Sequence, residues 1–266
     1  MLKLNSIANY QLRWTTLRNF NFLNGENSNG LIPRIENTEN FSSFNKKEIQ
    51  SALKTIKYYI LPAKPGRDFK ETEIYNRAYS FFKQFWSETF KDLRSEREFN
   101  YADEFRKQDA LSLLMKGEEV VGLVLLNYYN RFCLSTFDHS YFNDYPDESL
   151  FALKRERKQN LMTQQHFSIS KRFRNGFSGI NFAATIVGLS LKVAKLWDSP
   201  CFVVAREDVA SKHIVKNFGF QQIGPSTKMH NVPVSIMGCD ESKEYHKQDV
   251  NFCIDYLWKK RIDLTK

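Results

Sequence analysis

One stretch of this chain limits its possible folds more than any other: a strand, a short basic loop with two glycines and a helix follow one another directly. Residues 161–170 read as a strand, residues 171–179 read KRFRNGFSG, and residues 180–196 carry apolar side chains at helical spacing. The first amides of a helix lack intrahelical partners and lie at the positive end of its dipole, so phosphate binds there. The unit therefore predicts an α/β protein with a phosphate-binding loop.

The elements on either side of this unit also mix helices and strands. Apolar residues at three- and four-residue steps predict a helix over residues 75–93, and two apolar runs around a Gly-containing turn predict a β-hairpin over residues 110–130. Residues 95–109 between them read as a charged loop. Further expected elements are helices at 148–158, 209–217 and 250–262 and strands at 201–205 and 233–239. This order predicts a sheet flanked by helices rather than an all-helical or all-β protein.

Three parts are expected along the chain. Residues 1–70 form an N-terminal extension, residues 71–240 the core domain and residues 241–266 a C-terminal helix. The extension is rich in Asn and Ser and contains the turn signal NGENSNG. Within it, residues 46–59 predict a short helix that ends before Pro62.

The charge and hydropathy of the chain narrow the class of partner. The formal net charge is +9, which favours an anionic partner such as a phosphate-rich cofactor, an acidic carrier protein, an anionic membrane or nucleic acid. Lys and Arg are dispersed rather than grouped in blocks, so charge alone does not choose among these partners. No run of eighteen or more apolar residues and no signal-peptide core occurs, so we expect a soluble, cytoplasmic protein without a transmembrane segment.

Several common sites do not fit the sequence. The four cysteines are scattered without C-x-x-C or Cys/His ligand spacing, so we expect neither a metal nor a disulfide scaffold. The basic loop lacks the Gly-Lys-Ser/Thr ending of a P-loop and the glycine pattern of the dinucleotide fingerprint. The phosphate-bearing ligand is therefore expected to be of another kind.

The basic loop and the elements after it resemble the GNAT superfamily of acyltransferases. In that superfamily a strand leads into Arg/Gln-x-x-Gly-x-Gly/Ala, where Arg174 and Gly179 match the first and last positions and Phe177 replaces the middle Gly. The later segment CFVVAREDVASKHIVKNFGFQQIG has the superfamily's strand, helix and terminal Gly-Phe, at Gly219 and Phe220. The resemblance spans about residues 75–240 and implies a mixed, mostly antiparallel sheet flanked by helices.

One branch of the superfamily is more similar still. The segments FSISKRFR and HNVPVSIMGCD resemble those of long-chain N-acyl amino acid synthases and acyl-homoserine-lactone synthases, and Asp109 matches an acidic position of that branch. The resemblance implies an acyl-CoA or acyl carrier protein (acyl-ACP) thioester as donor and a small amine as acceptor, with Asp109 on the acceptor's ammonium group. It assigns the donor to the strand end and the loop, at Phe167, Ser168, Ile169, Lys171, Arg172, Arg174, Asn175, Gly176, Phe177, Ser178 and Gly179.

The expected acid and base positions of the family are altered in this chain. Thr163 stands where the branch usually has Glu, and Val215 stands where many acetyltransferases have a Tyr acid. His166 replaces an Arg on the same strand, and because imidazole titrates near neutrality we expect it to act as the base. Glu207 is the second catalytic candidate. Both residues also have a non-catalytic interpretation. His166 would then be a strand residue hydrogen-bonded to a neighbour, and Glu207 a solvated residue at the start of a helix.

Three functions stay open at this point. The first is acyl transfer, with a long chain favoured, from acyl-CoA or acyl-ACP to a small amine such as an amino acid. The second is acetyl-CoA-dependent N-acetylation, including of aminoacyl-tRNA, where nucleic acid is the less favoured partner. The third is a GNAT-like module that binds a ligand without turnover, which the altered acid and base positions favour.

Overall fold

The computed structural model describes residues 46–93, 99–209, 211–240 and 243–265. The chain divides into two units, and all that follows concerns the second, Ser43–Lys266. The NGENSNG turn and most of the expected N-terminal extension lie outside the described residues.

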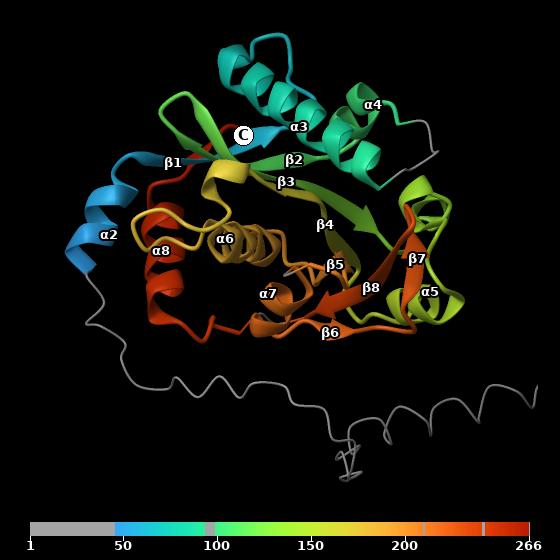
Figure 1. Ribbon diagram of the computed structural model, residues 1–266. Coiled ribbons are helices and arrows are strands. Elements are labelled where there is room, and N and C mark those ends of the chain that lie inside the picture. The colour runs from blue at the N-terminus through green and yellow to red at the C-terminus, as the bar shows by residue number, and fades with distance from the viewer. Residues whose placement is uncertain (1–45, 94–98, 210, 241–242, 266) are drawn as a thin grey trace, which may run out of the picture. The chain divides into compact units, whose positions relative to one another are not determined.

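A single mixed sheet forms the centre of the second unit (Figure 1). Its strand order is β6-β8-β5-β4-β3-β2-β1-β9, with β7 paired to β8. Neighbouring strands are antiparallel except for the pairs β4/β5 and β1/β9. The strands are β1 (Ile56–Pro62), β2 (Ala110–Lys116), β3 (Glu119–Asn130), β4 (Asn160–Ile169), β5 (Cys201–Arg206), β6 (Gln221–Gln222), β7 (Thr227–Met229), β8 (Val232–Cys239) and β9 (Ile262–Asp263). The mixed, mostly antiparallel sheet expected from the sequence is confirmed.

Helices cover both faces of this sheet (Figure 1). The helices are α2 (Lys46–Leu53), α3 (Thr72–Asp92), α4 (Tyr101–Arg106), α5 (Asp147–Lys154), α6 (Phe182–Leu196), α7 (Ser211–Asn217) and α8 (Gln248–Lys259), with 3-10 turns η1 (Leu134–Thr136), η2 (Ser140–Phe142) and η3 (Lys171–Phe173). Alternate strand residues point to opposite faces. Tyr58 and Ile60 therefore join the core beneath α2, α6, α7 and α8, while Tyr59 and Leu61 join the core beneath α3 and α4.

Two sequence interpretations are corrected by the structure. Residues 46–59 were expected to be one helix, but α2 ends at Leu53 and Ile56–Pro62 forms β1, which pairs along its whole length with β2. The sheet thus begins before residue 70. The second correction concerns the expected loop at residues 95–109, which contains α4. Asn100 caps that short helix by accepting a hydrogen bond from the Asp103 amide at 3.2 Å.

The central helix α6 packs so tightly that a glycine in it has no room for a side chain. A Cβ on Gly188 would lie 2.2 Å from Cδ1 and 2.8 Å from Cγ1 of Ile254 on α8, and 3.2 Å from the Phe218 ring. We expect Gly188→Ala to lower the free energy of unfolding by about 1–3 kcal/mol, because overpacking outweighs the better helix propensity of Ala. Gly66→Ala is the matched control, since nothing lies within 4 Å of its Cβ position. Denaturant unfolding of the two variants tests this. An unchanged midpoint of unfolding for Gly188→Ala would contradict the prediction that this site has no room for a side chain.

Candidate active site

The basic loop after β4 exposes backbone amides at a tight turn. Phe177 and Ile180 exchange backbone hydrogen bonds of 3.3 and 2.9 Å across a two-residue turn. Its two central residues, Ser178 and Gly179, have φ values of +47° and +78°, as a turn of this kind requires. Within the described part of the chain, the amides of these two residues have no hydrogen-bond acceptor. The turn therefore offers free donors to an anion.

Glycine is needed at one further position of this loop. Gly176 has a φ of +82°, and a Cβ there would lie 2.9 Å from the backbone oxygen of Ile180. Both the left-handed backbone and this close approach exclude a larger side chain. The loop conformation thus depends on glycine at this position.

A hollow of about 410 Å³ lies against this loop. It is lined by residues 174–181 together with Lys247 and Asp249 from the start of α8. Asn181 caps α6 by accepting a hydrogen bond from the Ala184 amide at 3.0 Å, which leaves the first two amides of the helix without an intrahelical partner. The Arg174 and Lys247 cations and these amides outweigh the Asp249 carboxylate. The hollow therefore suits a phosphate or pyrophosphate group.

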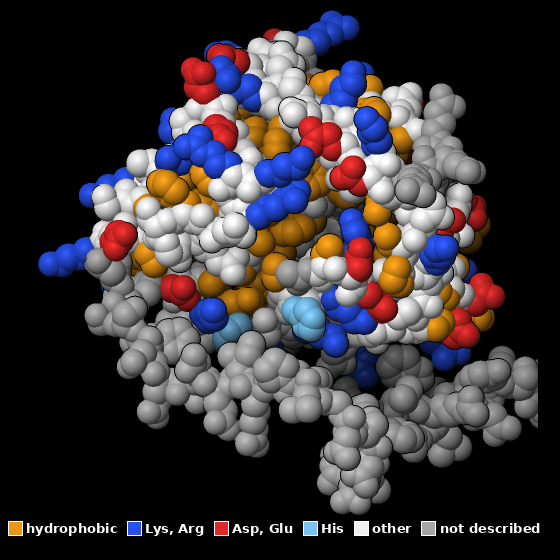
Figure 2. All heavy atoms as spheres, in the orientation of Figure 1, with side chains coloured by type: hydrophobic (Ala, Val, Ile, Leu, Met, Phe, Trp, Pro, Cys, Tyr) orange, Lys and Arg blue, Asp and Glu red, His pale blue; other side chains and the backbone are white. Residues whose placement is uncertain are grey.

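The three basic residues of the loop do not converge on one anion. Of the three, only Arg174 is among the residues that line the hollow. Its Nε donates to the Ile169 oxygen at 3.2 Å, and its guanidinium carbon lies 5.4 Å from the centroid of the Phe85 ring on α3. The Lys171 ammonium is 2.9 Å from Glu88 on α3 and lowers the pKa of that carboxyl. Arg172 pairs with Glu119 at 2.9 Å. Figure 2 shows Lys and Arg side chains beside exposed hydrophobic atoms on the face that carries this loop.

The strand that leads into the loop carries a β-bulge at His166. Leu123 pairs with Ser168 and Leu125 pairs with Gln165, so two residues of β4 face one residue of β3. His166 has a φ of +52°, the left-handed conformation typical of a bulge and uncommon outside Gly. A bulge of this kind turns a side chain and its neighbouring amides away from the regular ladder.

The bulge lies where β4 and β5 part. The two strands pair only over Met162, Thr163 and Gln164, opposite Cys201, Phe202 and Val203. Beyond this point β4 keeps its pairing with β3, and β5 keeps its pairing with β8. In the described chain, the edge of β4 from residue 165 onward therefore has no strand partner on the β5 side. Its backbone groups are available to a ligand between the strands.

His166 is held in a largely aromatic site beneath α3 and α4. The Phe82, Trp86 and Phe99 rings meet its imidazole edge-on at centroid distances of 5.4, 4.8 and 5.6 Å. Its Nε2 lies 3.6 Å from Oε2 of Glu104, and its side chain is 15% exposed. Burial lowers the pKa of His166, and the Glu104 carboxylate partly opposes this effect. The imidazole is therefore predominantly neutral at pH 7, the form that accepts a proton.

The carboxylate behind His166 stays ionised. Burial opposes ionisation of Glu104, but its hydrogen bonds from His166 and Lys107 hold its pKa at about 2. The Lys107 ammonium lies 2.7 Å from Oε1, which leaves Oε2 to the imidazole. Phe167, the next residue along β4, packs into the opposite core beneath α6. His166 and Phe167 therefore lie on opposite faces of the sheet.

We expect Glu104→Gln to lower the pKa of His166 further. The carboxylate favours the protonated imidazole, and its loss leaves burial alone to act on the ring. NMR titration of the imidazole C–H signals tests this, with His166→Ala assigning the signal among the five histidines. Glu88→Gln on the exposed side of α3 is the control and should leave the midpoint unchanged. A titration midpoint of His166 that is unchanged or higher in Glu104→Gln would contradict the contact between these two side chains.

A hydrogen bond from α3 fixes the bulge. The Trp86 indole Nε1 donates to Ser168 Oγ at 3.0 Å, and that hydroxyl donates to the His166 oxygen at 2.8 Å. From the sequence, Trp86 is only one of the apolar residues of the helix predicted at residues 75–93. The structure shows that its indole N–H is also a hydrogen-bond donor to β4. Ser168 was expected to contact the donor. Its side chain is fully buried, and its hydrogen bonds stabilise the bulge of β4.

A buried polar network continues from the bulge along β4. Gln165 donates to Thr163 Oγ1 at 2.9 Å and to the Tyr129 hydroxyl at 3.4 Å, and it accepts from Gln108 at 3.3 Å. Among the described residues, Gln108 Oε1 and the Tyr141 hydroxyl are buried without a hydrogen-bond partner. Buried polar atoms are almost always paired in proteins. The network was missed from the sequence, although the run Thr-Gln-Gln at residues 163–165 of a buried strand is its visible signal.

The two remaining candidate residues, Asp109 and Glu207, are held by hydrogen bonds to other groups of the chain. Asp109 is exposed, and its Oδ2 accepts a hydrogen bond from the Tyr128 amide at 2.7 Å. Glu207 accepts from Lys212 at 2.8 Å, from Ser226 at 2.7 Å and from Ser235. Hydrogen bonds from these three residues hold its pKa at about 2, so the carboxylate is a weak base at neutral pH. These contacts favour a structural part for Glu207, and the acceptor-binding role of Asp109 stays a prediction.

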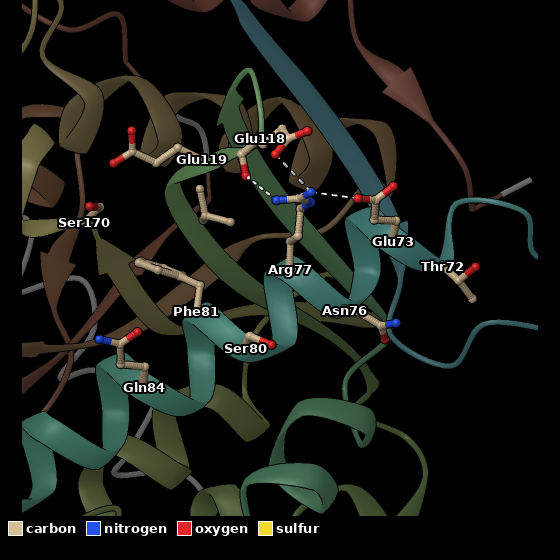
Figure 3. Close-up of a pocket in the computed structure, with 11 residues that line it drawn as sticks. Thr72, Glu73, Asn76, Arg77, Ser80, Phe81, Gln84, Glu118, Glu119 and Ser170 are labelled. Carbon is tan, nitrogen blue, oxygen red and sulfur yellow. Dashed lines mark hydrogen bonds and ion pairs between the residues drawn. The ribbon is translucent and has the colours of Figure 1, made fainter.

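The larger hollow on the outer side of α3 is less suited to a phosphate. It measures about 660 Å³, and Figure 3 shows Arg77 at its centre between Glu73 and Glu118. The Arg77 guanidinium lies 2.7 Å from Glu73 and 3.2 Å from Glu118, so its charge is already matched. Glu119 adds a further carboxylate to the lining. An anionic ligand is therefore expected in the smaller hollow at the basic loop.

Among the residues that the structure describes, no helix combines the length and the apolar character that a membrane span requires. Nor does this part of the chain bring three His, Cys, Asp or Glu side chains together in a way that would hold a metal ion.

The chain was compared with known proteins. No protein-family model matches it, and no curated protein matches it. Among solved structures, an acyl-CoA N-acyltransferase from Pseudomonas aeruginosa is 11% identical with a TM-score of 0.46, over 69% of this chain and 99% of that one. FeeM, an N-acyl amino acid synthase from uncultured soil microbes, is 13% identical with a TM-score of 0.47, over 78% of this chain and 95% of that one.

A third solved structure is BjaI, a CoA-dependent acyl-homoserine lactone synthase. It is 11% identical with a TM-score of 0.48, over 78% of this chain and 92% of that one. The chain is similar to these proteins in the arrangement of its helices and strands. Its own sheet order, the bulge at His166 and the strand–loop–helix unit define a mixed sheet flanked by helices, the fold that the sequence predicts.

Proposed function

We propose that this protein is an N-acyltransferase, which moves an acyl group from an acyl-CoA or acyl-ACP thioester to the amine of a small acceptor. One observation carries the proposal: β4 bulges at His166 where it parts from β5, and the same strand leads straight into the phosphate-suited loop. The loop holds the phosphates of the donor, and the open edge of β4 receives its thioester. The acyl carbonyl then lies against the same strand that carries the imidazole.

The reaction follows from this arrangement. The neutral amine attacks the thioester carbon, and a tetrahedral oxyanion forms. His166 takes the proton that the amine loses, and amides at the open edge of β4 stabilise the oxyanion. The oxyanion then collapses to the amide, the C–S bond breaks, and the leaving thiolate takes the proton from the imidazolium. Glu104 stabilises the imidazolium that forms, because its ionised carboxylate lies 3.6 Å from Nε2.

The acceptor side of the site is the polar network beside His166. Its atoms at Gln108 and Gln165 suit a small polar amine better than an apolar one. The donor's acyl chain is proposed to be long, as in the synthase branch that the sequence resembles. The aromatic residues between β3 and α5 are divided between the interior and the surface: Phe142 and Tyr145 fill a small core with Phe202, and Phe132 is exposed.

Turnover is the experiment that tests the proposal. Purified protein is incubated with acetyl-CoA, palmitoyl-CoA or palmitoyl-ACP and a mixture of amino acids and other small amines, and products are identified by mass spectrometry. An amide product that depends on His166 supports the proposal, and the preferred donor separates long-chain transfer from acetylation. Donor binding without any product would instead assign the chain to a binding module. A thiol-reactive dye is unsuitable as the readout because Cys133 is exposed.

A further inference from the structure

A second surface lies at the opposite end of β4 from the donor loop. There the last residues of β3, the first residues of β4 and the C-terminal ends of α5 and α6 meet. The Arg131 amide donates to the Gln159 oxygen at 3.0 Å, and its guanidinium donates to the Lys154 oxygen at 3.0 Å and the Lys158 oxygen at 2.8 Å. The Tyr128 and Trp197 rings contact at a centroid distance of 5.9 Å. These contacts define the apolar–basic end, residues 128–134, 151–158 and 195–198.

Large apolar side chains project from the apolar–basic end. Leu134 is 92% exposed, Phe132 63% and Phe151 61%. Tyr128 and Leu196 at the same end of the sheet are also among the exposed large hydrophobic residues. Single exposed apolar residues are ordinary, but a group of this size marks a surface that contacts something apolar.

Basic side chains accompany these apolar ones. Residues 154–158 read KRERK, with a single acidic residue among them. The Arg131 guanidinium lies 4.2 Å from the Phe132 ring centroid and donates to backbone oxygens, which do not cancel its charge. Lys158 pairs with Asp198 at 2.7 Å, although both side chains are largely exposed. The balance of charge at this end is positive.

We propose that the apolar–basic end docks on an anionic lipid bilayer. Apolar and aromatic side chains insert at the boundary between headgroups and acyl chains, while Lys and Arg stay at the level of the anionic headgroups. Leu134 and Phe132 project from a turn instead of lining a groove, which fits insertion into lipid better than a protein partner with a flat matching face. The proposal is independent of the acyl-transfer reaction, since the donor loop lies at the other end of β4.

The cysteines of the chain offer a direct probe of this surface. Cys133 is exposed between Phe132 and Leu134, whereas Cys201, Cys239 and Cys253 are buried. An environment-sensitive fluorophore on Cys133 should shift to shorter wavelength when vesicles of phosphatidylcholine and phosphatidylglycerol are added. Vesicles of phosphatidylcholine alone should produce little shift, and added salt should weaken binding to the anionic vesicles. No shift with either vesicle, or an equal shift with both, would overturn the proposal.

Vesicle co-sedimentation of the unlabelled chain provides the second measurement. Leu134→Ser with Phe151→Ser should weaken binding to the anionic vesicles about tenfold or more, because each substitution removes an inserted side chain. Val209→Ser is the control, since this side chain is 42% exposed outside the apolar–basic end, and it should bind as the wild type does. Equal binding of all three proteins would overturn the proposal. So would a wild-type dimer in light scattering that the double variant loses, because the surface would then belong to a second copy.

Discussion

Replacing His166 by alanine is expected to lower kcat about 10²–10⁴-fold, the range over which a positioned general base acts. The imidazole is the neutral titratable group at the bulge, and Glu104, its partner, is ionised and committed to Lys107. Donor affinity should stay within about twofold, because the phosphate-suited loop is a separate part of the site. Steady-state kinetics with the preferred donor and acceptor measure the first quantity, and calorimetric titration with CoA measures the second.

Two controls separate catalysis from folding in this experiment. His166→Gln keeps a polar side chain in the bulge but cannot act as a base near pH 7, so it should be as slow as His166→Ala. His213→Ala removes an exposed histidine from α7 and should leave kcat unchanged. Full activity in either His166 variant would remove this residue from the mechanism.

Replacing Arg174 by alanine is expected to raise the dissociation constant for CoA about 10–100-fold. Among the three basic residues of the loop it alone lines the hollow, and Lys171 and Arg172 are held by Glu88 and Glu119. Charge-assisted hydrogen bonds to an anion contribute about 1.5–3 kcal/mol each. Because the guanidinium also donates to the Ile169 oxygen, a thermal melt of the variant must show that the fold is kept.

The control for this prediction removes one positive charge elsewhere. Lys192 on α6 is 40% exposed and pairs with Asp255, so Lys192→Ala changes the net charge equally without touching the loop. Its CoA affinity should match the wild type. An affinity for CoA that is the same in Arg174→Ala as in Lys192→Ala would show that the phosphate site lies elsewhere.

The elements that the sequence predicted well are those whose pattern is local. The strand at residues 161–170 and the helix at residues 180–196 appear as β4 and α6 within two residues of the expected ends, and the loop between them begins with η3. Alternation, glycines and helical spacing are all visible over a short window. β1 was missed because it lies in a segment with a helical start, and its strand character depends on pairing with β2 and β9.

The site was predicted only in part, for the same physical reason. The phosphate-binding role proposed for the loop depends on its own residues, so Arg174 and Gly179 could be named as candidates from the sequence alone. The partners of His166 were not, because Glu104 and Trp86 reach it from other elements through tertiary packing. The ion pairs that hold Lys171 and Arg172 also depend on the placement of α3 and the β2–β3 hairpin.

Native mass spectrometry of the full chain mixed with acetyl-CoA, palmitoyl-CoA and palmitoyl-ACP tests the central claim most directly. We predict a one-to-one complex with at least one of these thioesters, strongest with a long-chain donor, and a clear loss of that complex in Arg174→Ala. The absence of a complex with all three donors would contradict the assignment of this loop to an acyl thioester.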